Sequence, residues 1–353
     1  MSRSALRTLI ATVSALALPS MVSAVGLAGL QACGGSQSEE EDPPPVCYLT
    51  HEVPDGGMMR NLNAEEWADL VVRGYRSGGQ SSQNCVGDTI QWRRTDRACD
   101  VHEDDDERPP TPVEVSEENV IVGRGDTAAR RPVWVITHEF EDGDGFGPVA
   151  VTQRTEMGVS VTAIGSLRMP RDRARLRLRT TGGQEIVVAD GERCPPEEEE
   201  EMGDDEEAPN PDEEGNEEQP PTCLRYARLM PVVGDQVMSP ELRNREGHCM
   251  GPAQVFLSRE QTIVLETGWE RTFRLAASME YRGGGVIVHE QVTAEDADPR
   301  DPGRPARLFR TTDVDRVIMV QERGGMRSSN VPLFERSVRA GGSTQLPLNE
   351  AEL

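Results

Sequence analysis

The chain has 353 residues, a net charge of −25 and only 4% aromatic residues, and all 37 of its basic residues are arginine. Phosphates repel a polyanion, so nucleic acid is excluded as a partner. The absence of lysine excludes Schiff-base chemistry, and the length is enough for two or three domains.

The N-terminal segment has the layout of an export signal. Arg3 and Arg7 precede an apolar run over residues 9–18. No later apolar run approaches the ~20 residues that a transmembrane helix requires. One reading of this segment is ordinary secretion with cleavage after Ala24, because residues 22–24 offer small side chains at the right places.

The other reading rests on residues 30–34, Leu-Gln-Ala-Cys-Gly, which resemble a bacterial lipobox. The resemblance implies that residues 1–32 are a signal peptide and that Cys33 becomes the lipidated first residue of the mature protein. The residue after Cys33 is Gly34 and not aspartate. By the same resemblance, this implies that the protein is directed to the outer membrane of a Gram-negative cell envelope. The expected partner is then the lipid bilayer, since each buried methylene adds ~0.8 kcal/mol to anchoring.

Two acidic segments that contain proline divide the rest of the chain. Residues 33–46 are predicted to be a tether, and residues 195–221, with 14 acidic and no basic residues, a disordered linker. The linker separates a first module at 47–194 from a second module at 222–340, and residues 341–353 form a C-terminal tail.

The two modules share features in the same order, which indicates a tandem duplication. Residues 113–122 (VEVSEENVIV) and 255–264 (VFLSREQTIV) are identical at five of ten positions. The segments 133–140 and 273–281 both alternate between apolar and polar residues before a glycine-rich turn, which is typical of a β-hairpin. We therefore predict a mostly β fold of two tandem small antiparallel β-sandwich or barrel-like modules.

Each module is expected to contain one short helix. Asn63 and Glu66 form a capping-box pattern that predicts a helix in the first module. Ser239 and Pro240 offer a cap and a first-turn proline that predict one in the second module.

In the strand predicted at 273–281, one apolar face consists of Phe273, Leu275, Ala277, Met279 and Tyr281.

Six of the seven cysteines remain if Cys33 carries lipid, and an even number predicts three disulfides in an oxidising compartment. Matching the two modules predicts the pairs Cys47–Cys85, Cys223–Cys249 and Cys99–Cys194. The sequence has no C-x-x-C pair, so we expect no metal site.

A run of alternating arginines is the sharpest predicted surface feature. A strand would align on one face the side chains of Arg173, Arg175, Arg177 and Arg179. Such a face is a possible anion site for lipopolysaccharide phosphates, an acidic glycan or the acidic linker. The alternative is a solvated face, or an edge strand protected by charge.

Two further patterns are weaker. Asp142 and Asp144 alternate with glycine, as in a fragment of a calcium loop, but the later ligands of such a loop are missing, so we favour a solvated hairpin tip. His138 and His289 each precede a glutamate, and neighbouring strand residues point to opposite faces. We therefore interpret both histidines as strand residues without a catalytic role.

No catalytic motif is present, so we predict no enzyme activity, no catalytic residue and no cofactor. The leading hypothesis is a membrane-anchored extracytoplasmic lipoprotein that acts as a binding or structural component of the envelope. Its partner would be an envelope glycan, lipopolysaccharide or a protein. The alternative is a secreted or lipid-anchored hydrolase whose site is assembled only in the fold.

Overall fold

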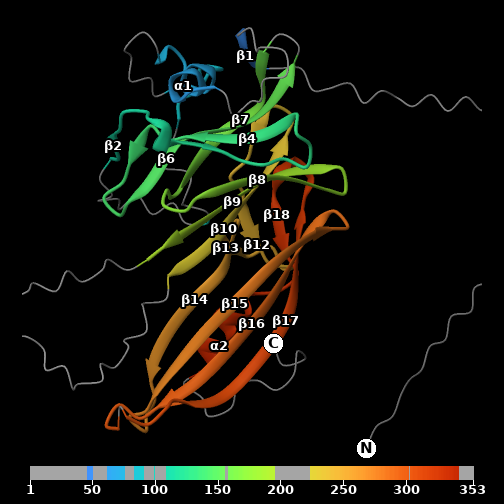
Figure 1. Cartoon of the computed structure of the whole chain (residues 1–353). Helices are drawn as coiled ribbons and strands as arrows, with labels where there is room; N and C mark the ends of the chain where they lie inside the picture. Colours follow the sequence, from blue (N-terminus) through green and yellow to red (C-terminus); the bar gives the residue numbers. More distant parts are fainter. Residues whose placement is uncertain are drawn as a thin grey trace, which may run out of the picture. The chain divides into compact units, whose positions relative to one another are not determined.

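The strands of this chain form one continuous and mostly antiparallel sheet (Figure 1). The computed structural model describes residues 46–50, 62–75, 83–90, 99, 109–155, 158–194, 223–301 and 303–341. Within these residues eighteen strands are joined by hydrogen-bonded pairings into one sheet, and β10 pairs with strands of both of its regions. The fold is therefore mostly β, as the sequence predicts.

The first region of the sheet contains most strands of the N-terminal half. Their order is β3–β4–β6–β7–β1. In addition, β5 pairs with β6, β2 pairs with β5, and β11 pairs in parallel with β7. The bounds are β1 Cys47–Thr50, β2 Thr111–Pro112, β3 Val120–Val122, β4 Arg130–Val135, β5 His138–Glu139, β6 Asp144–Thr155, β7 Gly158–Pro170 and β11 Gln236–Val237.

The second region contains the longest strands, and Figure 1 shows β14 to β17 side by side. Its order is β8–β9–β10–β14–β15–β16–β17–β18–β12–β13, in which only β12 and β18 are parallel. The bounds are β8 Arg175–Thr181, β9 Gln184–Arg193, β10 Leu224–Val233, β12 Glu241–Arg243, β13 Cys249–Pro252, β14 Gln254–Val264, β15 Glu270–Arg282, β16 Gly285–Ala297, β17 Arg307–Val320 and β18 Met326–Ser328.

The helix α1 spans Ala64–Val71 and begins at the predicted capping box. The Asn63 side chain accepts from the Glu66 amide at 2.9 Å, and the Glu66 carboxylate accepts from the Asn63 amide at 2.8 Å. Both bonds satisfy amides that the first helical turn leaves open. The apolar side of α1, with Trp67 and Leu70 almost fully buried, packs in one cluster with residues of β4 and β7.

The period-two pattern of 273–281 matches a strand with one buried face. Phe273 and Leu275 on β15 are buried, while Arg274 between them is exposed and binds Glu260 and Glu295 on the same outer face. A second helix, α2 at Leu333–Ala340, packs against β15 and β16. Its Leu333 and Phe334 are buried with Phe273 and Leu275 in one cluster.

The two predicted modules do not fold as independent units. Strand β9 pairs with β10 over eight residue pairs, from Leu224 opposite Arg193 to Pro231 opposite Ile186. The end of β10 also pairs with β11, which lies beside β7 in the first region. The described residues all fall in one compact unit that spans Pro43–Leu353. The expectation of two modules separated by a spacer is therefore wrong.

The disulfides explain how the halves are joined, and they correct two predicted pairs. The structure joins Cys47 to Cys85, which is the pair expected from the sequence. The other two bridges are Cys99–Cys249 and Cys194–Cys223, in place of the predicted Cys223–Cys249 and Cys99–Cys194. Pairing of β9 with β10 brings the cysteines next to these strands together, with a Cα–Cα distance of 4.2 Å.

The helix predicted near Ser239 is also wrong, because residues 241–243 form strand β12. Leu242 is buried and lies opposite Met326 of β18, and Ser239 donates from its hydroxyl to the Ser166 carbonyl instead of capping a helix. Burial against a distant strand thus overrides the local helix signal.

The matched repeats share a hairpin but not a complete fold. Residues 133–155 and 273–297 both turn back as antiparallel strands. The two halves differ after these hairpins, because residues 175–193 form the hairpin β8–β9 whereas residues 307–320 form the single strand β17.

Candidate ligand-binding site

A cavity of about 260 Å³ lies between the N-terminal turn of α2 and strands β12 to β17, and we name it the α2 cavity. Its apolar walls are contributed by Leu242, Met250, Phe256, Leu275 and Phe334. Four charged side chains also line it, namely Arg259, Glu290, Arg316 and Glu335. An apolar cavity with a few fixed polar groups is the usual form of a small-molecule site.

A buried ion pair forms the base of the α2 cavity. The side chains of Arg316 and Glu290 are only 1% and 2% exposed. Arg316 donates from Nε and Nη2 to Glu290 Oε1 at 3.0 and 2.7 Å, and from Nη1 to Ser328 Oγ at 3.3 Å. These contacts neutralise and fix both charges, as burial of an ion pair requires.

The same carboxylate also positions α2. Glu290 Oε2 accepts from the backbone amide of Leu333 at 2.8 Å. Leu333 is the first residue of the helix, and Pro332 before it provides no side-chain cap. A carboxylate is favoured at a helix N-terminus by the free amides and the helix dipole. Both oxygens of Glu290 are therefore committed to structural contacts.

Arg259 lies at the wall of the cavity between two aromatic rings. Its guanidinium carbon is 5.0 Å from the centroid of Phe256 and 5.0 Å from that of Phe334. These distances are within the range of cation–π attraction. The stack connects β14 to α2 and places a cationic group at the cavity.

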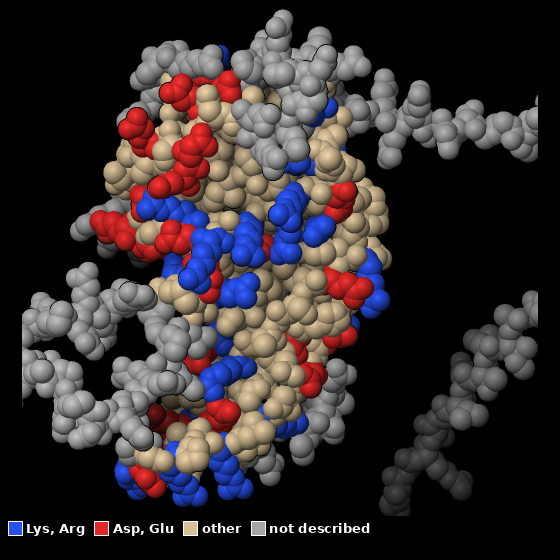
Figure 2. All heavy atoms as spheres, in the orientation of Figure 1, with Lys and Arg blue, Asp and Glu red and all other residues tan. Residues whose placement is uncertain are grey.

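The predicted arginine face is found only in part. Arg175, Arg177 and Arg179 point outward from β8 while Leu176 and Leu178 between them are buried. Arg173 lies in the preceding turn with a φ of 56°. Figure 2 shows a band of arginines across the molecule at the height of β8.

Three of these arginines bind carboxylates of the protein itself. The contacts are Arg173 with Glu192 at 3.2 Å, Arg177 with Asp190 at 2.7 Å, and Arg179 with Asp126 at 2.9 Å. Much of the positive charge is thereby balanced within the fold, so less of it is available to an external anion than the sequence suggests. Arg175 is exposed.

The two aspartates of the calcium-loop candidate also face arginines. Asp144 is buried and contacts Arg168 and Arg193, and Asp142 contacts the same two arginines. Burial raises the pKa of the Asp144 carboxyl, and the bond from Arg193 opposes that rise. Two guanidiniums occupy the positions that a cation would need, so we assign the pair to an ion-pair cluster.

The two histidines occupy strands, as interpreted from the sequence. His138 on β5 is half-buried, and its Nδ1 lies 2.8 Å from the Thr137 hydroxyl, while burial lowers the pKa of the ring. His289 on β16 faces solvent with Asp315 at 2.7 Å, which raises its pKa. Neither ring lines the α2 cavity.

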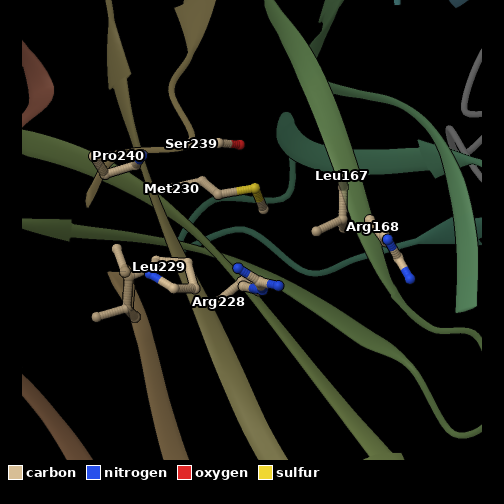
Figure 3. Close-up of a pocket in the computed structure, with 9 residues that line it drawn as sticks. Leu167, Arg168, Arg228, Leu229, Met230, Ser239 and Pro240 are labelled. Carbon is tan, nitrogen blue, oxygen red and sulfur yellow. The ribbon is translucent and has the colours of Figure 1, made fainter. Parts of the chain in front are cut away.

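A second cavity is too small for a ligand. Its volume is about 20 Å³, and Figure 3 shows Arg168 of β7 and residues 228–230 of β10 around it. That volume is room for about one water molecule. Among the described residues, the one group of possible metal ligands is Glu192, Cys194 and Cys223, and its two sulfurs form a disulfide. They are therefore not available as thiolates.

Sequence reasoning missed the α2 cavity, although one signal was present. Residues 286, 288, 292 and 294 of β16 are all apolar and buried, and Glu290 interrupts this inward face. Arg316 interrupts the inward face of β17 in the same way. A charged residue in an otherwise apolar period-two series indicates a buried partner.

Cys33 and the acidic segment 195–221 lie outside the described residues. Within the part of the chain that is described, no helix has the length and apolar character to cross a bilayer. No protein-family model, curated protein or solved structure matches this chain.

Proposed function

We propose that this protein is an exported, lipid-anchored binding protein of the cell envelope, and that it binds a small ligand in the α2 cavity. The observation that carries the binding role is the cavity itself. It is built on long paired strands and one helix, and its charged base is fixed by the contacts of Glu290. Sites on such rigid elements hold their geometry better than sites on loops.

The location rests on the lipobox-like residues 30–34 and on the cysteines. The six cysteines after Cys33 all form disulfides. Such use of cysteine is typical of an oxidising compartment and unusual in the cytosol. An outer-membrane anchor through Cys33 agrees with both features.

A binding role fits the α2 cavity better than hydrolysis does. The described residues that line it include no serine, threonine, cysteine or histidine that would act as a nucleophile or a base. Its buried carboxylate, Glu290, already accepts from Arg316 and from the Leu333 amide. A general base needs a free oxygen within reach of the substrate proton.

We also propose that the hairpins at 133–155 and 273–297 descend from one duplicated unit. Support comes from their alternating sequences and their shared antiparallel turn. In this proposal the second copy later acquired the strands and helix that enclose the α2 cavity.

The anchor is tested by metabolic labelling with palmitate and by membrane fractionation. Cys33→Ser should abolish the label and release the protein or leave an uncleaved precursor. A matched control, Ala24→Leu, blocks the alternative cleavage site and should leave labelling and fractionation unchanged. Normal membrane partition of Cys33→Ser, or loss of processing in Ala24→Leu alone, would contradict the lipid anchor.

A further inference from the structure

Two side chains of opposite charge line the α2 cavity from different elements. Arg259 comes from β14, and Glu335 comes from the first turn of α2. Across the residues that the structure describes, neither forms an ion pair, with the other or with a third group. The cavity therefore holds one cation and one anion whose charges are not balanced by direct contact.

Arg259 forms no hydrogen bond or ion pair with the residues that the structure describes, so its N–H donors are available to a ligand. Phe256 and Phe334 contact the guanidinium at 5.0 Å from each ring centroid, which constrains its orientation. A guanidinium carries its five N–H donors in its own plane, and these match a carboxylate in a two-point contact. Arg259 is thus suited to bind a carboxylate while its position is held by the two rings.

Glu335 offers the complementary group. An ionised carboxylate only accepts hydrogen bonds, so its natural partner in the cavity is a cationic donor such as an ammonium group. The other acidic residue of the cavity, Glu290, is neutralised by Arg316 and by the Leu333 amide. The free charges that a ligand meets are therefore one positive and one negative.

We propose that the α2 cavity binds a small zwitterion with an apolar body, namely an α-amino acid with an apolar side chain. This inference rests on the proposed binding role of the cavity. The ligand carboxylate contacts Arg259, its ammonium contacts Glu335, and its side chain packs against Leu242, Met250 and Leu275. A cavity of about 150 Å³ holds benzene, so about 260 Å³ holds roughly ten non-hydrogen atoms. Leucine is of this size.

The test is calorimetric titration of the exported full chain with four probes of similar shape. They are L-leucine, 4-methylpentanoate without the amine, 3-methylbutylamine without the carboxylate, and the neutral 3-methylbutanol. Leucine should bind roughly tenfold or more tightly than each of the other probes, because each charge-assisted contact contributes about this factor.

Two variants assign the charges. Arg259→Gln should weaken leucine and 4-methylpentanoate roughly tenfold and should strengthen 3-methylbutylamine, because a repulsive positive charge is removed. Glu335→Gln should weaken leucine and the amine but strengthen 4-methylpentanoate, because a repulsive charge is removed. A gain of affinity cannot arise from misfolding. The matched control is Arg175→Gln on the outward face of β8, which should change none of these affinities.

Each outcome decides between the proposals. If all four probes bind wild type equally, or if Glu335→Gln leaves leucine binding unchanged, the zwitterion inference is wrong and the cavity remains a binding site. If none of the probes binds, both the inference and the proposed function of the cavity are overturned. If Arg175→Gln removes binding, the anion site lies on β8 instead.

Discussion

Among the polar contacts of this fold, the ion pair between Arg316 and Glu290 should be the one whose disruption lowers the free energy of unfolding most. Glu290→Gln keeps the shape of the side chain but leaves the Arg316 guanidinium buried, at 1% exposure, without a balancing charge. Removal of one partner from such a pair costs about 3–5 kcal/mol of unfolding free energy. Glu290→Gln should also remove the hydrogen bond that the Leu333 amide donates to Glu290. The amides of α2 should therefore become less protected from hydrogen exchange.

A double substitution separates the charge from the packing. The double variant Glu290→Gln with Arg316→Met removes both charges and fills the space with side chains of similar volume. It should lower the free energy of unfolding by less than the sum of the two single substitutions. Arg274→Met is a matched control on the outer face of the same sheet, where Arg274 is 45% exposed and its partner Glu260 is 30% exposed. Solvent screens that pair, so its loss should cost at most about 1 kcal/mol.

The assay is urea denaturation followed by far-ultraviolet circular dichroism, with the midpoint and slope fitted for each variant. Glu290→Gln should move the midpoint far more than Arg274→Met does. Equal shifts for these two variants would refute the argument that burial makes the inner pair sensitive. Strict additivity in the double variant would refute the direct coupling of Arg316 and Glu290.

Three further predictions concern a turn, a histidine and the acidic segment. Gly182→Ala should destabilise the fold by about 1–3 kcal/mol more than Gly183→Ala. Both glycines have a positive φ, but only at Gly182 would a Cβ lie 2.5 Å from the backbone of the facing hairpin. Burial lowers the pKa of His138, so its contribution to stability is present above about pH 6.5 and is lost as the pH falls through the folded pKa. His138→Gln should therefore reduce the drop in the urea midpoint between about pH 7.5 and pH 5. The acidic composition of 195–221 predicts first cleavage there by a Glu-specific protease, with both fragments held together by disulfides until reduction.

Each of these has a result that would count against it. Equal melting temperatures for Gly182→Ala and Gly183→Ala would contradict the close approach of the two hairpins. His289→Gln is the control for the histidine, because its ring is exposed and its pKa is raised, so its effect should have the opposite sign. Fragments that separate without a reductant would contradict the bridges between the halves.

Local patterns predicted some of the local elements of this fold, although the cap pattern at Ser239 predicted a helix where the structure has strand β12. The capping box at Asn63 gave the start of α1, and alternation over 273–281 gave the inward and outward faces of β15. These features depend on residues within a few positions of each other, so a single sequence contains the needed information.

Features that depend on distant contacts were missed. The helix α2 lacks a local cap, and its first amide is bound by Glu290, which lies 43 residues earlier in the chain. The α2 cavity exists only because this helix covers the inner face of β15 and β16. Neither its enclosure nor the pairing of Arg316 with Glu290 follows from the spacing of residues in the sequence.

The disulfides failed for a related reason, and their true pairing changes the meaning of the acidic segment. A flexible spacer of this length would span ~30 Å, but the Cα atoms of the bracketing residues Cys194 and Cys223 are 4.2 Å apart. Residues 195–221 are therefore an insertion between two adjacent strands. Their 14 acidic residues do not separate two modules.

The two halves of the chain must then be stable together. Ile186 and Val188 of β9 pack in one cluster with Val286 and Val288 of β16. The bridge from Cys99 to Cys249 closes 150 residues, which restricts the unfolded chain by roughly 5 kcal/mol in the chain-entropy model. Met250, next to this bridge, lines the α2 cavity. A ligand site formed by residues of the second half thus depends on the first half, and a fragment that begins after the acidic segment should not bind.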